Sequence, residues 1–255
     1  MRYIHFAFVV LVLHALLSCQ NPAEAPTSTS PEDGTDSLSY SIEVLEQEGP
    51  CTDTQRLICL DIHIESMRIK AGASPAVKRH VETYLTQQIN TTDNVEQTAQ
   101  NPTEVADNLQ EEYGRILKEM DNYQLPWQYE RRLKVYFNQE PLFGVELYAQ
   151  SYTGGAHPVS FQYFYLFDTQ NGAPLKWTKL IQKSHHGSLR EQAEEMFRKQ
   201  QEIKEGQGYE EAGYWFDNEQ FYLPDNFRYS KEGLSFLYNP YEDRPMVRRQ
   251  HPLGL

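Results

Sequence analysis

Two runs of alternating apolar and polar residues, separated by a Gly-Gly pair, constrain this chain more than any other feature. The first run covers Val145–Tyr152 and the second covers Phe161–Asp168, with Gly154 and Gly155 between them. A period of two is typical of β-strands, and adjacent glycines permit a reversal. The second run is apolar on both faces, with Phe161, Tyr163, Tyr165 and Phe167 on one face and Phe164 and Leu166 on the other. A strand of this kind is usually covered on both faces, so we expect it to lie centrally in a sheet.

Two amphipathic helices are predicted in the N-terminal half. Alternation indicates strands over Tyr40–Val44 and Cys59–Ile69, and Gly49-Pro50 is expected to end the first of them. Ser74 caps the first helix, and Asn101 caps the second with a glutamate three residues later. Their expected buried faces are Val77, Val81, Leu85 and Ile89 in the first helix and Val105, Leu109, Tyr113, Ile116 and Met120 in the second.

The C-terminal half reads as more strands and one further helix. A strand over Leu133–Phe137 precedes the two runs around the Gly-Gly pair, and short links between consecutive strands favour antiparallel pairing. Ser188 and Glu191 form a capping box that is expected to begin a helix reaching about Lys204. The predicted fold class is therefore α+β, with an antiparallel β-sheet and helices packed on it.

The N-terminus is typical of an exported lipoprotein. Residues 1–19 combine one early positive charge, a short apolar segment and a terminal Leu-Leu-Ser-Cys that resembles the bacterial lipobox. We therefore expect Cys19 to carry the lipid, including palmitate, that anchors an extracytoplasmic protein in a bacterial cell envelope; the other reading is an ordinary cleaved signal with a chance cysteine. Residues 20–37 read as a flexible tether. Residues 38–255 form one domain, or two subdomains spanning 38–125 and 126–255.

The net charge limits the possible binding partners, and two cysteines of the expected domain are candidates for a disulfide. The formal net charge of the 255-residue chain is −13, which argues against nucleic acid as a partner because phosphate binding needs clustered cations. An acidic surface suits a basic protein partner, or it simply keeps a secreted protein soluble. Cys51 and Cys59 lie close together in the expected exported domain. They form either a disulfide or two buried thiols.

Three features in fixed order carry a resemblance to a known family. They are Tyr152-Thr-Gly-Gly-Ala-His157, then Phe167-Asp-Thr-Gln-Asn-Gly172, and then Asn226-Phe227 with a later Tyr238-Asn-Pro-Tyr-Glu242. The chain resembles the extracytoplasmic domain shared by RsiV-type lysozyme-sensing anti-sigma factors and the N-terminal part of PdaC-type polysaccharide deacetylases. The resemblance covers roughly Ser39–Glu242, implies an α+β fold, and suggests a lysozyme-like protein or wall glycan as ligand. The sequence after Glu242 departs from the family pattern, so the closing strand is expected to be missing or altered.

The loop of the Gly-Gly pair is the candidate ligand site. Adjacent glycines allow close approach of a ligand, and Tyr152 and His157 can frame a pocket beside Gly154 and Gly155. The alternative is a hairpin corner that needs glycine for its turn. We expect no metal, no cofactor and no catalytic residues, because neither a metal-ligand spacing nor a nucleophile motif occurs.

The sequence thus predicts an envelope lipoprotein that serves as a non-catalytic binding module for a lysozyme-like protein or wall glycan. One alternative is an enzyme that acts on wall glycan through dispersed carboxylates such as Glu146 and Asp168. A second alternative is a structural envelope protein. The deacetylase catalytic domain and a sigma-binding segment are both absent from the sequence, so neither of those activities is expected.

Overall fold

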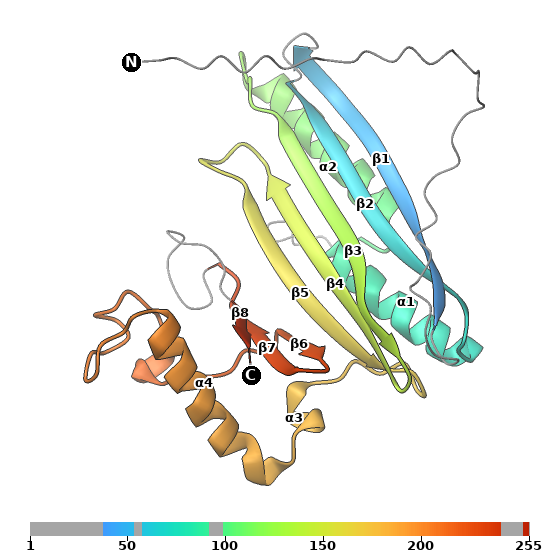
Figure 1. Ribbon diagram of the computed structural model, residues 1–255. Coiled ribbons are helices and arrows are strands. Elements are labelled where there is room, and N and C mark those ends of the chain that lie inside the picture. The colour runs from blue at the N-terminus through green and yellow to red at the C-terminus, as the bar shows by residue number, and fades with distance from the viewer. Residues whose placement is uncertain (1–37, 54–57, 92–98, 241–251, 255) are drawn as a thin grey trace, which may run out of the picture. The chain divides into compact units, whose positions relative to one another are not determined.

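A five-stranded sheet and a separate three-stranded sheet organise the chain (Figure 1). The computed structural model describes residues 38–53, 58–91, 99–240 and 252–254, so the predicted signal peptide, Cys19 and the tether lie outside the described residues. The elements in chain order are β1 (Ser39–Asp53), β2 (Ile58–Ala71), α1 (Pro75–Asn90), α2 (Pro102–Glu119), β3 (Trp127–Gln139), β4 (Leu142–Tyr152), β5 (Val159–Asp168), α3 (Trp177–Leu180), α4 (His186–Gln200), β6 (Phe227–Ser230), β7 (Gly233–Leu237) and β8 (Pro252–Gly254). Two short 3-10 turns occur at Lys183–His185 and Asp217–Glu219.

The predicted α+β class is confirmed, with one qualification about strand direction. The large sheet has the order β1-β2-β3-β4-β5, and every neighbouring pair is antiparallel except β2 and β3, which are parallel. Both helices of the N-terminal half lie in the connection between β2 and β3, and such a long crossover returns the chain in the same direction. Figure 1 shows α1 and α2 on one face of the sheet, here called the helix face.

The helix face holds the larger hydrophobic core. Leu60, Ile62 and Ile64 of β2 are fully buried there, as the alternation predicts. Ser74 Oγ accepts a hydrogen bond from the Val77 amide, and Asn101 Oδ1 accepts one from the Glu104 amide, so both predicted caps are present. The expected stripe of α1 is entirely buried. Met120 of the second stripe is 53% exposed instead, because α2 ends at Glu119.

The Gly49-Pro50 pair distorts β1 but does not end it. β1 continues to Asp53, with register irregularities on both sides of Cys51. A Cβ atom at Gly49 would stand 2.9 Å from Leu60 Cβ, so the glycine permits close approach of the two strands. The structure joins Cys51 and Cys59 in a disulfide beyond this point.

β5 lies at the edge of the large sheet, not at its centre, and the expectation of a central strand is wrong. Its free backbone edge is occupied by side chains: Asn226 Oδ1 accepts from the Phe164 amide at 2.9 Å, and Asn239 Oδ1 accepts from the Gln162 amide at 2.9 Å. The side-chain Nδ2 of Asn226 also donates to the Gln162 carbonyl at 2.8 Å. These side chains provide the hydrogen bonds that a sixth strand would have made, which is why an edge strand can be this apolar.

A second, mostly aromatic core joins α4, the small sheet and the outer face of β5. Phe197 of α4 contacts the rings of Tyr214, Phe216 and Phe221, and Leu166 of β5 belongs to the same cluster. The predicted capping box at Ser188 is wrong, because α4 begins at His186 and the Ser188 hydroxyl donates to the His185 carbonyl. The small sheet closes with β8, so a final strand is present after the sequence departs from the family pattern. Within the described ranges, no helix is long and apolar enough to cross a membrane.

Candidate functional site

The Gly-Gly loop lies at one end of the β4–β5 hairpin, and its glycines differ in role. Gly154 has a φ of 90°, and a Cβ atom there would clash with the Tyr123 hydroxyl. Gly155 has open space where its Cβ would be. Position 154 therefore requires glycine, both for the positive φ of the turn and for the close approach of Tyr123. Position 155 has room for a larger side chain.

The two side chains expected beside those glycines do not converge. Tyr152 ends β4 half-buried, and His157 is exposed with its Nδ1 atom 3.2 Å from the Pro158 carbonyl oxygen. Neither of them lines the two cavities described below. The proposed ligand role of this loop thus stays a prediction.

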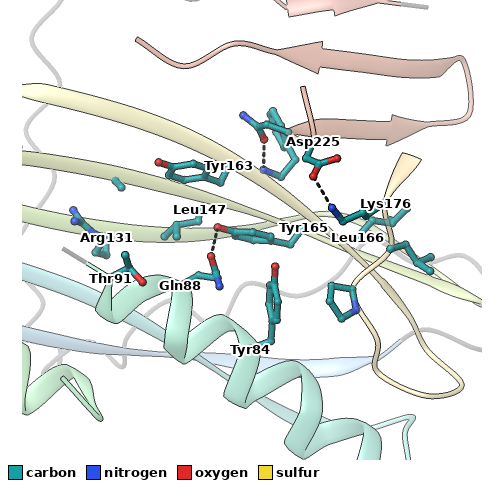
Figure 2. Close-up of a pocket in the computed structure, with 15 residues that line it drawn as sticks. Tyr84, Gln88, Thr91, Arg131, Leu147, Tyr163, Tyr165, Leu166, Lys176 and Asp225 are labelled. Carbon is teal, nitrogen blue, oxygen red and sulfur yellow. Dashed lines mark hydrogen bonds and ion pairs between the residues drawn. The ribbon is translucent and has the colours of Figure 1, made fainter. Parts of the chain in front are cut away.

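The larger cavity lies on the helix face between α1 and β5 and has a volume of about 470 Å³. Figure 2 shows Tyr84 and Gln88 extending from α1 toward Tyr165 of β5, with Tyr163 beside it. The cavity exists because α1 packs mainly on β2, and the sheet continues past the helix to β4 and β5. Cavities of this size, lined by rings with a few polar groups, are typical small-ligand sites.

Three rings along β5 form an aromatic ladder, defined here as Phe161, Tyr163 and Tyr165. Adjacent ring centroids are 6.1 Å and 6.4 Å apart, and the successive ring planes differ by only 23° and 16°. Tyr84 meets Tyr165 edge to face at 5.5 Å and thereby closes the helix side of the ladder. The cavity bounded by Tyr84, Tyr163 and Tyr165 is called the ladder cavity below.

Hydrogen-bonding groups surround these rings. The Tyr165 hydroxyl donates to Gln88 Oε1 at 3.2 Å, and burial raises the pKa of Tyr165, so this phenol remains a donor at neutral pH. Burial also raises the pKa of Tyr84, against an opposite effect of the nearby Lys176. Lys176 Nζ stands 2.6 Å from Asp225 Oδ2 at one end of the cavity, so its charge is paired there (Figure 2).

Arg131 supports the other end of the ladder cavity. Its side chain lies near Thr91 in Figure 2 and is 1% exposed. One terminal nitrogen donates to the Gln150 carbonyl at 3.2 Å and to the Ser151 hydroxyl at 3.3 Å, and the guanidinium lies 3.9 Å from the Tyr129 ring centroid. These contacts fix the guanidinium as a wall of the cavity.

A second, more polar cavity of about 360 Å³ lies on the outer face of β1, β2 and β3. His63 stands between Glu46 and Glu65, with a ring nitrogen 3.2 Å from each carboxylate. Within the described ranges, no group of three or more His, Cys, Asp or Glu side chains is arranged to hold a metal ion. The acidic residues lining this cavity are Glu46, Glu48, Asp61 and Glu130.

The two carboxylates weighed for catalysis have other contacts. Asp168 accepts hydrogen bonds from the Gln170 amide and from Asn171 Nδ2, so it shapes the turn after β5. Glu146 accepts from Gln162 Nε2 on the outer face. The pair occupies different cross-strand positions of β4 and β5, because Glu146 lies opposite Phe164 and Asp168 lies opposite Leu142.

Sequence reasoning missed the ladder cavity although it identified the ladder's residues. It placed Phe161, Tyr163 and Tyr165 on one face, but it read that face as covered. The missing contribution was α1, where Tyr84 and Gln88 lie four residues apart and therefore on one side of the helix, next to its buried stripe. The only sign of the cavity in the sequence was therefore this Tyr and Gln, spaced so that both face the same side of the helix.

Comparisons with known proteins agree with this architecture. A family model described as Deacetylase PdaC matches residues 56–160, and one described as Protein of unknown function (DUF3298) matches residues 179–248. A search of curated proteins found no match. The fold is similar to a crystal structure of a DUF3298 family member from Bacteroides fragilis, with a TM-score of 0.65 at 16% identity, covering 86% of this chain and 90% of that one.

A DUF3298 family protein from Pseudomonas aeruginosa has the same fold, with a TM-score of 0.56 at 15% identity, covering 85% of this chain and 89% of that one. The two matched segments are separated in the chain by residues 161–178, which hold most of β5 and the first half of α3. The chain thus combines a segment similar to the PdaC family model with a following segment similar to the DUF3298 model, on a fold shared with DUF3298 family structures.

Proposed function

We propose that this protein is a non-catalytic binding module of the cell envelope and that its ligand is wall glycan, held in the ladder cavity. The observation that carries the proposal is the combination of near-parallel rings with neutral hydrogen-bonding groups in one cavity. A sugar ring presents C–H groups on its faces and hydroxyls around its rim. Ring faces and polar groups placed together match both parts of such a ligand.

The two cations of the ladder cavity both have polar partners within the protein. Lys176 is paired with Asp225, and Arg131 is held by backbone and hydroxyl oxygens. The ladder cavity further lies where the two family matches meet, since Tyr84 belongs to the PdaC-type match, Asp225 to the DUF3298 match, and the ladder continues between them.

The cellular setting of the proposal is a lipoprotein anchored through Cys19 on the outer side of a bacterial membrane. It is supported by the sequence of residues 1–19 and by the family of the following domain. Replacement of Cys19 by Ser is expected to move the protein from the membrane fraction to the soluble fraction. Retention of that variant in the membrane fraction would remove the lipid anchor from the proposal.

A lysozyme-like basic protein is the second candidate ligand, favoured by the acidic outer cavity. Glu46, Glu48, Asp61 and Glu130 gather there on an otherwise acidic chain. Complementary charge accelerates association but contributes modest affinity at exposed sites. Binding to lysozyme that persists at high salt would support this candidate, and binding that disappears with salt would show only general attraction.

Titration calorimetry of the purified protein with soluble wall-glycan fragments tests the first candidate. Tyr163→Ala removes the central ring of the ladder and is expected to weaken binding about tenfold or more, as the loss of a central aromatic contact does. Tyr148→Ala is the matched control, because Tyr148 is half-buried on the outer face of β4. Saturable binding that both variants retain equally would place the ligand elsewhere, and no binding by the wild type would refute the glycan proposal.

A further inference from the structure

The aromatic ladder extends beyond the ladder cavity. Tyr163 and Tyr165 line the cavity, whereas Phe161 lies outside its lining although its ring continues the same series. Residues two apart in a strand are separated by about 6.6 Å, so the rings repeat at a nearly constant spacing along β5. The small angles between successive ring planes give all three rings a common orientation.

The two ends of the ladder differ. At the Tyr165 end, Pro174, Leu175 and the Lys176–Asp225 ion pair line the cavity. At the Phe161 end, β5 leads back to the exposed loop of residues 153–158. The Tyr165 end of the ladder therefore lies in the cavity, and the Phe161 end lies outside its lining.

The cross-strand register relates the Phe161 end of the ladder to the cavity. Ala149 of β4 lies opposite Arg131 on one side and opposite Phe161 on the other. Ala149 and Arg131 both line the ladder cavity, so the cavity reaches the row of the sheet in which Phe161 stands. The small side chain of Ala149 lies in that row between the cavity wall at Arg131 and Phe161.

From these features we infer that the ligand is a linear saccharide chain bound end-on, with its terminal disaccharide in the ladder cavity and its following units on Phe161 toward the 153–158 loop. This inference rests on the proposed function and adds the form of the ligand. A repeating row of similarly oriented rings fits a polymer of repeating flat units better than it fits a single sugar. Phe161 is then a binding residue that only longer chains contact.

Affinity as a function of chain length tests the inference. Calorimetry compares a wall-glycan disaccharide with a hexasaccharide on the purified protein. We expect the hexasaccharide to bind wild type about fivefold more tightly or better, equivalent to about 1 kcal/mol for one added aromatic contact. Phe161→Ala should remove that advantage and leave disaccharide affinity unchanged.

Three controls make each outcome decisive. Phe161→Tyr keeps a ring and should keep the chain-length advantage, and Tyr148→Ala should change neither affinity. Urea unfolding of each variant checks that the fold is intact. Equal wild-type affinity for both saccharides, or an equal loss of both in Phe161→Ala, overturns the extended site while leaving glycan binding in place. If wild type binds neither saccharide, the proposed function itself fails.

Discussion

Asn226 is expected to be one of the most destabilising positions to change outside the two hydrophobic cores. Its side-chain oxygen accepts from the Phe164 amide at 2.9 Å, and its amide group donates to the Gln162 carbonyl at 2.8 Å and to the Leu237 carbonyl at 3.2 Å. One half-buried side chain thus holds the edge of β5 and the end of β7 together. Its removal leaves three backbone groups to find new partners at once.

The magnitude follows from those three hydrogen bonds. Each contributes a net ~1 kcal/mol to folding, and water can replace part of the loss because the position is half-buried. Asn226→Ala should therefore lower the free energy of unfolding by about 2–3 kcal/mol. Asn226→Asp keeps the acceptor for Phe164 but places a carboxylate against two carbonyl oxygens, so it should be at least as destabilising at neutral pH.

Equilibrium unfolding in urea measures the effect. The midpoint should fall with an unchanged dependence on denaturant, because the same surface is exposed on unfolding. Asn108→Ala on α2 is the matched control and should stay within about 0.5 kcal/mol of wild type, since no comparable contacts hold that side chain. If Asn226→Ala and Asn226→Asp both remained within that margin, the edge of β5 would not depend on this side chain.

Three further predictions concern the loop, the buried phenol and the disulfide. Gly154→Ala should lower thermal stability, since alanine at positive φ costs about 1–2 kcal/mol even before the clash, whereas Gly155→Ala should be nearly neutral. The raised pKa of Tyr165 favours its protonated form in the folded state, so stability should be complete below about pH 10 and fall above it, and Tyr165→Phe should flatten that fall in urea unfolding. Replacing Cys51 and Cys59 by serine should cost about 2.5 kcal/mol by loop closure over a separation of 8, and an unchanged urea midpoint would contradict this.

Local patterns in the sequence were sufficient for the N-terminal core. The caps at Ser74 and Asn101 use side chains next to the helix they begin, and the stripe of α1 depends only on helical period. Such signals require no knowledge of the tertiary structure. The prediction of a cap at Ser188 also used local sequence alone, and it was wrong. The helix begins two residues earlier, at His186, and the Ser-x-x-Glu pattern could not show this.

Long-range contacts explain what the sequence did not reveal. The edge position of β5 was hidden because its apolar faces suggested a central strand, whereas its covering comes from Asn226 and Asn239, more than sixty positions later. Both asparagines belong to the third of the sequence features that carry the family resemblance. Their side-chain amides imitate a neighbouring backbone, and no period in the sequence encodes that role.

The same contacts link stability to the ladder cavity. Asn226 lines that cavity while it holds the edge of β5, and its neighbour Asp225 pairs with Lys176 at the Tyr165 end. The DUF3298 segment therefore fixes one end of the cavity through the side chain that attaches it to the sheet. If the ladder cavity is the binding site, neither family segment can form it alone, which gives a physical reason for the two to occur together in one chain.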